Sequence, residues 1–207
     1  ILAGFTADVG FDVVDDADAI ALEVAGASNS GDELNSVDAN GVINTVVVSG
    51  GDVDATEAGV IQSISGYVGT ASDYDITDTA TALISAGDEV LNVAGVDIVT
   101  ASDTSVNANI GGDLAGFTAE IEFDVVDNAA GLIAEMGGAD VAGHLTEANS
   151  ITVDDTQTGS VVNAHDGAIL AGFTADVGFD VVDDADAIAL EVAGASNSGD
   201  ELNSVDA

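Results

Sequence analysis

Acidic side chains are the residues of this sequence whose chemistry is most distinctive. The 207 residues contain 39 Asp and Glu, of which 29 are Asp, and neither Lys nor Arg. Ca²⁺ binds carboxylate oxygens, and two carboxylates about 5 Å apart repel by about 1 kcal/mol in water. Because the chain has no Lys or Arg partner, each carboxylate must be solvated, capped by backbone N–H groups or neutralised by external cations.

Six aspartates share one place in the pattern, directly after a run of β-forming residues. Four close a run that begins with Phe or Tyr and two follow the intervening runs: Asp15, Asp78, Asp127, Asp183, Asp103 and Asp154. Stacked parallel strands would bring these carboxylates to one edge, where their repulsion favours bound cations. We therefore predict structural Ca²⁺ at this edge. The alternative is that the acids cap helices and form a solvated face without stoichiometric metal.

A second candidate calcium site begins at Asp38 and Asn40, within the sequence Asp-Ala-Asn-Gly, and continues with Asp52 and Asp54. Alternating Asp and Asn before Gly is typical of calcium loops, although the full 12-residue EF-hand spacing is missing. The four residues are predicted ligands on this pattern.

The strands that would position these acids recur along the chain. Aromatic-led runs open at Phe11, Tyr74, Phe123 and Phe179, with spacings of 63, 49 and 56 residues. Further β-rich runs lie between them, at 43–49, 96–100 and 150–153. The three spacings add up to 168 residues, which is the length of one repeat period. Each period therefore holds three subrepeats and six candidate strands, about one per 28 residues. This is the size class of strand–helix solenoid repeats.

Ala-rich stretches after the strands predict short helices. Those after Asp78, Asp103 and Asp127 begin at Asp, Thr or Asn residues, which are favoured N-caps, and Gly residues such as Gly87 stop them. Strands joined by such crossovers lie parallel, with right-handed connections. We predict an α/β fold, a right-handed parallel solenoid of about 28-residue strand–helix coils. Tandem calcium-binding β-sandwich modules, with the Ala-rich stretches as loops, are the alternative.

Residues 1–39 and 169–207 are identical, so the two copies are offset by 168 residues. We interpret 1–168 as one full tandem repeat unit and 169–207 as the start of the next, within a longer array. Such arrays are usually structural or adhesive. The apolar content of 47% and mean hydropathy of +0.37 predict a folded core rather than disorder.

The net charge of −39 excludes electrostatic binding to nucleic acid or to an anionic membrane surface. It favours an extracellular or cell-surface location, where salt and divalent ions are plentiful. The chain has no Cys, which excludes disulfides and thiol catalysis. No catalytic motif assembles, and identical tandem copies fit poorly with a single active site, so we predict that the protein is not an enzyme.

The pattern [Phe/Tyr]-Asp-[Val/Ile]-x-Asp-x-Ala, alternating with Ala/Gly-rich segments, resembles tandem repeats in giant acidic bacterial surface proteins. These are adhesins, filament subunits and large RTX-associated chains, and the resemblance covers the whole chain. It implies an extracellular structural role and calcium dependence. The RTX nonapeptide Gly-Gly-x-Gly-x-Asp is missing, which argues against a β-roll calcium site.

Together these features predict a structural repeat of an extracellular filament, surface fibre or giant adhesin shaft, rigidified by calcium. The predicted partners are neighbouring copies of the chain, as a covalent tandem or an end-to-end polymer. The alternative is a repetitive binding module that presents an acidic face to glycan, mineral or ice.

Overall fold

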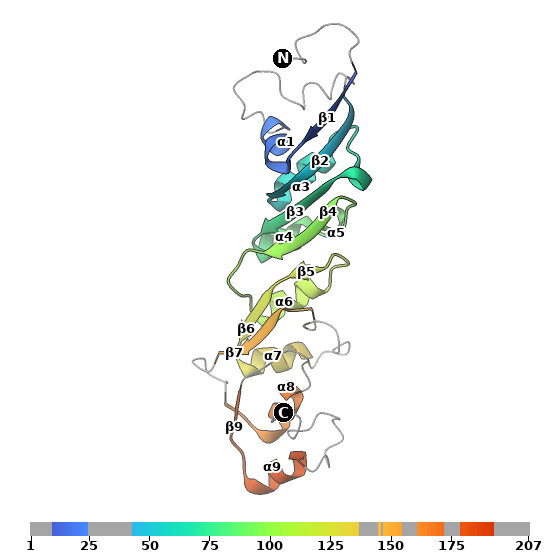
Figure 1. Cartoon of the computed structure of the whole chain (residues 1–207). Helices are drawn as coiled ribbons and strands as arrows, with labels where there is room; N and C mark the ends of the chain where they lie inside the picture. The colour runs from blue at the N-terminus through green and yellow to red at the C-terminus, as the bar shows by residue number, and fades with distance from the viewer. Residues whose placement is uncertain are drawn as a thin grey trace. The chain divides into compact units, whose positions relative to one another are not determined.

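The computed structural model describes residues 10–24, 43–136, 145, 147–154, 161–171 and 179–192. The chain divides into two compact bodies. The N-terminal body is Ile1–Ser102 with Phe117–Ile121, and the C-terminal body is Asp103–Gly116 with Glu122–Ala207. In each, parallel strands alternate with short helices (Figure 1). A strand together with its capping residue and the helix that follows is called a strand–helix module below.

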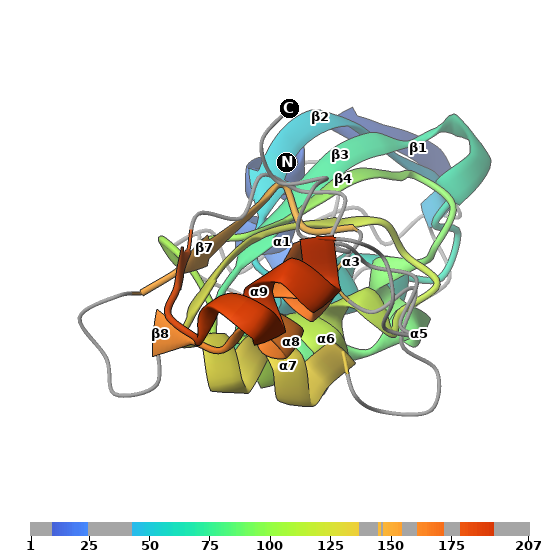
Figure 2. The same ribbon diagram turned by 90° about the horizontal axis from the view of Figure 1, so that it is seen from below.

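The N-terminal body carries a parallel sheet whose five strands run in the order β1-β2-β3-β4-β5. Helices α1 and α3 lie on the same face of this sheet and pack against each other (Figure 1 and Figure 2). The elements are β1 (Phe11–Asp15), α1 (Ala17–Val24), β2 (Ile43–Val53), α3 (Ala55–Gln62), the 3-10 turn η2 (Gly69–Ala71), β3 (Asp73–Asp78), α4 (Ala80–Ala86), α5 (Asp88–Leu91), β4 (Val96–Ala101) and β5 (Ile121–Glu122).

Strand β2 has a different neighbour along each half of its length. Its first half pairs with β1, from Phe11↔Ile43 to Asp15↔Val48, and its second half pairs with β3. Gly50 and Gly51 join the halves with φ of 80° and 101°, a backbone region that favours glycine. A Cβ on Gly51 would also lie 3.0 Å from the Ala17 nitrogen, so glycine lets β2 approach the start of α1.

The C-terminal body contains two short parallel pairs, β6 with β7 and β8 with β9. An isolated parallel bridge joins Val106, just before α6, to Val125 in β6. The elements are α6 (Ala108–Ala115), β6 (Asp124–Asp127), α7 (Ala129–Met136), β7 (Ser150–Val153), β8 (Val161–Val162), α8 (Ala164–Ala171), β9 (Asp180–Val181) and α9 (Ala185–Val192).

Seven helices in the described parts of the chain begin in the same way. The first helical residue is Ala, and the residue before it is Asp, Asn or Thr, whose side-chain oxygen accepts a backbone N–H in the first turn. The capping oxygens belong to Asp16, Asp54, Thr79, Asn107, Asn128, Asn163 and Asp184. Such caps offset the low intrinsic stability of helices of seven or eight residues.

The core lies between the strands and the helices of each body. Inward residues here are almost fully buried: Tyr74 and Ile76 of β3 are 1% and 0% exposed, and Phe123, between β5 and β6, is 3% exposed. Burial raises the pKa of the Tyr74 phenol, and its oxygen accepts a hydrogen bond from Gln62 Nε2 at 2.8 Å. Among the described residues, no buried side-chain polar atom lacks a hydrogen-bond partner.

The predicted α/β class and parallel strands are confirmed. The runs at 43–49, 96–100 and 150–153 are strands, and α4 and α7 follow Asp78 and Asp127 as predicted. The β-sandwich alternative is wrong for the described residues, because the Ala-rich stretches are helices and the strands pair in parallel.

Two local expectations about secondary structure were wrong. Asp52 lies in β2, and Asp54 caps α3 rather than lying in a loop, because Glu57 completes a capping box with it. The helix expected to start after Asp103 starts at Ala108 instead, because Asn107 caps it. The short strands β5 and β8 carried no sequence signal of their own.

Candidate functional site: aspartates between successive modules

The strand-end aspartates Asp78, Asp127 and Asp183 make the same pair of backbone contacts. One carboxylate oxygen accepts the N–H of the next residue, at 2.7 Å for Asp78 and Asp127 and 2.8 Å for Asp183. The other accepts the N–H of the alanine that begins a helix of the preceding module. These second contacts are Ala55 N to Asp78 at 3.1 Å, Ala108 N to Asp127 at 3.0 Å and Ala164 N to Asp183 at 3.0 Å.

This contact, called the aspartate clasp below, follows from the chemistry of helix ends. The first N–H groups of a helix have no partner within it, and the helix dipole places partial positive charge there. A carboxylate supplied by the next strand satisfies one of these donors with a charge-assisted hydrogen bond. The clasp therefore joins one module to the next and compensates one negative charge without a basic residue.

Asp183 shows the electrostatic effect of the clasp. The N–H groups of Ala164 and then Asp184 lower the pKa of its carboxyl group, because they stabilise the charged form. Its side chain is exposed, so the hydrogen bonds rather than burial dominate this shift.

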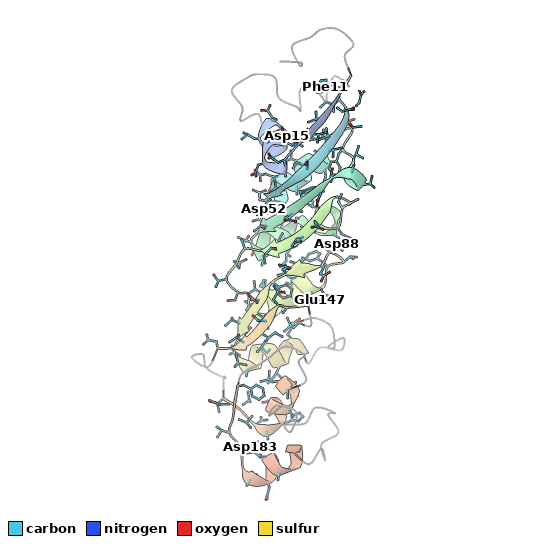
Figure 3. All side chains as sticks on the ribbon, in the orientation of Figure 1. Phe11, Asp15, Asp52, Asp88, Glu147 and Asp183 are labelled. Atoms are coloured by element: carbon cyan, nitrogen blue, oxygen red, sulfur yellow. The ribbon has the colours of Figure 1, made fainter. Side chains whose placement is uncertain are left out.

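Asp15 occupies the same sequence position as Asp183, 168 residues earlier, at the end of β1 (Figure 3). One of its oxygens accepts the N–H of Asp16 at 3.0 Å. Among the described residues, no helix N–H reaches its other oxygen. Asp15 therefore has half of the clasp geometry.

The other predicted metal ligands lie in different settings. Asp103 lies in the bend after β4, and Asp154 follows β7; both residues make interactions within the structure. Asp52 lies opposite Asp75 in the register of β2 and β3. Asp38 and Asn40 fall outside the described residues.

The metal site stays a prediction. Within the described parts of the chain, no three His, Asp or Glu side chains gather closely enough to hold a metal ion. Asp52 and Asp75 lie directly opposite each other in the pairing of β2 with β3, and Asp75 accepts the N–H of Ile98 at 3.2 Å. Two like charges directly opposite each other on neighbouring strands destabilise a sheet, so an external cation would reduce the repulsion of this pair.

Asp88 is an inter-segment anchor that the sequence did not reveal. Its carboxylate accepts the N–H of Thr118 at 2.9 and 3.1 Å and that of Ala119 at 3.2 Å, 30 and 31 residues further along the chain. The Thr118 N–H is the main cause of the lowered pKa of the Asp88 carboxyl group. Only Gly87, predicted as a helix stop, drew attention to this region, and nothing pointed to residue 118.

A groove of about 320 Å³ lies over α3 and α4. Its lining is made of Ala55, Thr56, Gly59, Ala82, Ser85, Ala86 and Val90. The groove carries two hydroxyl groups and no titratable side chain, so its lining supplies no ionisable acid or base.

No helix in the described parts of the chain combines the length and the apolar character needed to cross a bilayer. Comparisons with protein-family models, with curated proteins and with solved structures found no match.

Proposed function

We propose that this chain is a structural repeat of an extracellular filament, surface fibre or adhesin shaft, in which the modules form a right-handed parallel solenoid. The observation that carries the proposal is that the repeated sequence packs against the following module in its first copy and against the preceding module in its second copy. In the first copy, residues 11–24 pack against β2 and α3; in the second, the identical residues pack against β8 and α8. A module with a complementary surface on both sides can be stacked without limit.

The clasps support the same proposal, because they recur between modules rather than around one site. A catalytic or ligand-binding protein concentrates its special contacts in one place, whereas Asp78, Asp127 and Asp183 repeat one contact along the chain. Nearest-neighbour contacts of this kind stabilise repeat proteins in proportion to their length. The handedness is proposed from the general preference of parallel crossovers.

The experiment is to measure, by small-angle X-ray scattering, the length of chains containing one, two and three copies of residues 1–168, each chain ending in residues 169–207. A solenoid with six strand spacings of about 4.8 Å per period grows linearly, by on the order of 30 Å per copy. Independently tumbling units would instead give a length that grows as the square root of copy number. The second result would contradict the continuous stack.

We also propose that calcium stabilises the chain, independently of how its modules stack. The chain carries a formal charge of −39, and the clasps use backbone N–H groups rather than cations. We expect thermal unfolding, followed by circular dichroism, to shift upward in millimolar Ca²⁺ relative to EDTA at matched ionic strength. Equal melting in both buffers would remove calcium and leave the clasps and solvent screening as the source of charge compensation.

One observation favours the alternative of a binding module. Acidic side chains lie on the face of the sheet that points away from the core. Asp12 and Asp52 are exposed on neighbouring strands, and Asp75 is half-buried opposite Asp52. Asp12, however, accepts a hydrogen bond from Thr45 Oγ1 at 2.8 Å, so part of this row holds neighbouring strands together. Retention of the chain on calcium mineral or immobilised glycan, lost on Asp52→Asn with Asp75→Asn, would favour this alternative.

A further inference from the structure

The first module has an incompletely covered core. In the interior strands β3 and β6, the inward residues are buried: Tyr74 and Ile76 are 1% and 0% exposed, and Val125 is 0%. The equivalent residues of β1, Phe11 and Val13, are only half-buried. Since β2 covers one side of β1, this partial burial reflects the absence of a neighbour among the described residues on the other side.

The second copy of the same sequence shows what fits that side. Val182 donates its N–H to the carbonyl oxygen of Val162 at 2.9 Å, and Val161 and Val162 pair with Asp180 and Val181. Asp183 clasps the Ala164 N–H, and α8 packs against α9. Every group that makes these contacts in residues 180–192 is present, unchanged, in residues 12–24.

We infer that the side of β1 and α1 opposite β2 is a docking surface for the β8–α8 module of a second copy of this chain. The expected contacts are those of the second copy: Val14 N–H to the Val162 carbonyl, and Asp15 to the Ala164 N–H. A half-buried Phe11 and the open oxygen of Asp15 are then both satisfied. The inference goes beyond the proposed shaft, because it concerns non-covalent assembly and does not depend on calcium or cellular location.

Each chain also carries its own competitor for this contact. The β9–α9 module occupies the β8–α8 surface from within, and its effective concentration there is on the order of millimolar. Exchange replaces one set of contacts by an identical set, as in domain swapping, so the tethered copy prevails in dilute solution. Residues 179–192 therefore act as a cap, and releasing them exposes a head-to-tail interface. Because its two surfaces differ, such an interface generates open chains of molecules.

The experiment disrupts the contacts that one copy of the repeated sequence makes with the β8–α8 module, and it leaves the other, identical copy unchanged. The cap-release variant is Val181→Asp with Asp183→Asn, and its matched control is Val13→Asp with Asp15→Asn. At about 10 μM protein, roughly 100-fold below the tethered concentration, we expect the unmodified chain and the control to sediment as monomers. The cap-release variant should form concentration-dependent oligomers, and combining all four substitutions should return it to monomer.

A second readout separates docking from aggregation of a damaged chain. The sequence has no Cys, so Asp12→Cys and Val161→Cys introduce the only thiols, at positions equivalent to the observed pair Asp180 and Val161. In the cap-release variant, oxidation should give a ladder of covalent multimers with both thiols and at most dimers with either alone. A folded cap-release variant that stays monomeric, or a four-substitution variant that still oligomerises, would overturn the inference. Absence of the thiol ladder in oligomers would overturn it equally.

Discussion

The modules β1–α1 and β9–α9 have identical sequences and opposite environments. In the first, the side facing the following module is covered: β1 pairs with β2 along five residues, and Ala17 is 0% exposed beneath Gly51. In the second, the side facing the preceding module is covered by β8 and α8, while Ala185, the equivalent of Ala17, is exposed.

The difference shows that one module carries two separate sets of contacts. The side facing the following module uses the small Ala at the helix start and the Asp12 carboxylate, which accepts a hydrogen bond from Thr45. The side facing the preceding module uses the strand-end aspartate clasp. Because neither set shares a side chain with the other, substitutions made at equivalent positions in the two copies should have different effects.

The largest effect is expected from Ile20→Ala compared with Ile188→Ala. Ile20 is 1% exposed, whereas Ile188 is half-buried. Removing a buried Ile side chain costs about 2–5 kcal/mol, and the partly exposed one should cost about 1 kcal/mol. Urea unfolding of both variants measures the difference. Equal losses would mean that the two modules are equally covered in solution.

A second pair, Ala17→Val and Ala185→Val, tests the side facing the following module. The helix-propensity cost is the same in both copies, so it cancels in the comparison. Overpacking against Gly51 should cost about 1–3 kcal/mol at Ala17, whereas Ala185 should change by about 0.5 kcal/mol or less apart from propensity. Thermal unfolding monitors both. A larger loss at Ala185 would show that an additional element covers α9.

A third pair, Asp15→Asn and Asp183→Asn, tests the clasp on the other side. Asn keeps one acceptor oxygen but places an NH₂ group against an N–H donor when both oxygens are used. We expect faster amide hydrogen exchange at Val182 and in α9 for Asp183→Asn. For Asp15→Asn, exchange in β1 and α1 should be unchanged. Faster exchange in both would show that Asp15 is also clasped in solution.

The smallest expected effect is the acid response of the clasp. The folded pKa of Asp183 is lowered, so its contribution to stability is present above the unfolded value of about 3.9 and is lost as the pH falls through the folded value. Acid also relieves the general repulsion among carboxylates, in the unmodified chain and in Asp183→Asn alike. The unmodified chain and Asp183→Asn should therefore differ less in the rate of amide hydrogen exchange in α9 as the pH falls below about 4. A constant difference would assign the Asp183 effect to something other than its charge.

Much of the fold could be predicted from the sequence because its determinants are local. The caps at Thr79 and Asn128 act within three residues, and the spacing of Phe123 and Val125, which are both buried, reports the inward face of a strand. Parallel pairing followed from the helices between strands. The acids at 52–57 suggested a loop, whereas the reciprocal contacts of Asp54 and Glu57 start a helix there; the role of Asp52 and Asp54 as calcium ligands stays a prediction.

The candidate site was predicted only in part. The place of Asp78, Asp127 and Asp183 at strand ends was evident, but their partners were not, because each clasp closes over 19 or 23 residues. Asp88 reaches across 30 residues to Thr118 with no motif to announce it. Such contacts depend on how modules stack, which periodicity alone does not specify.

The sequence by itself determined the capped helices, since residues within four positions supply their hydrogen bonds, and it indicated the strands between them through runs of β-forming residues. Tertiary structure decided what each module does with its two sides. The identical runs at 11–15 and 179–183 form a five-residue strand beside β2 and a two-residue strand beside β8, because a strand extends only as far as its neighbour provides hydrogen-bonding partners.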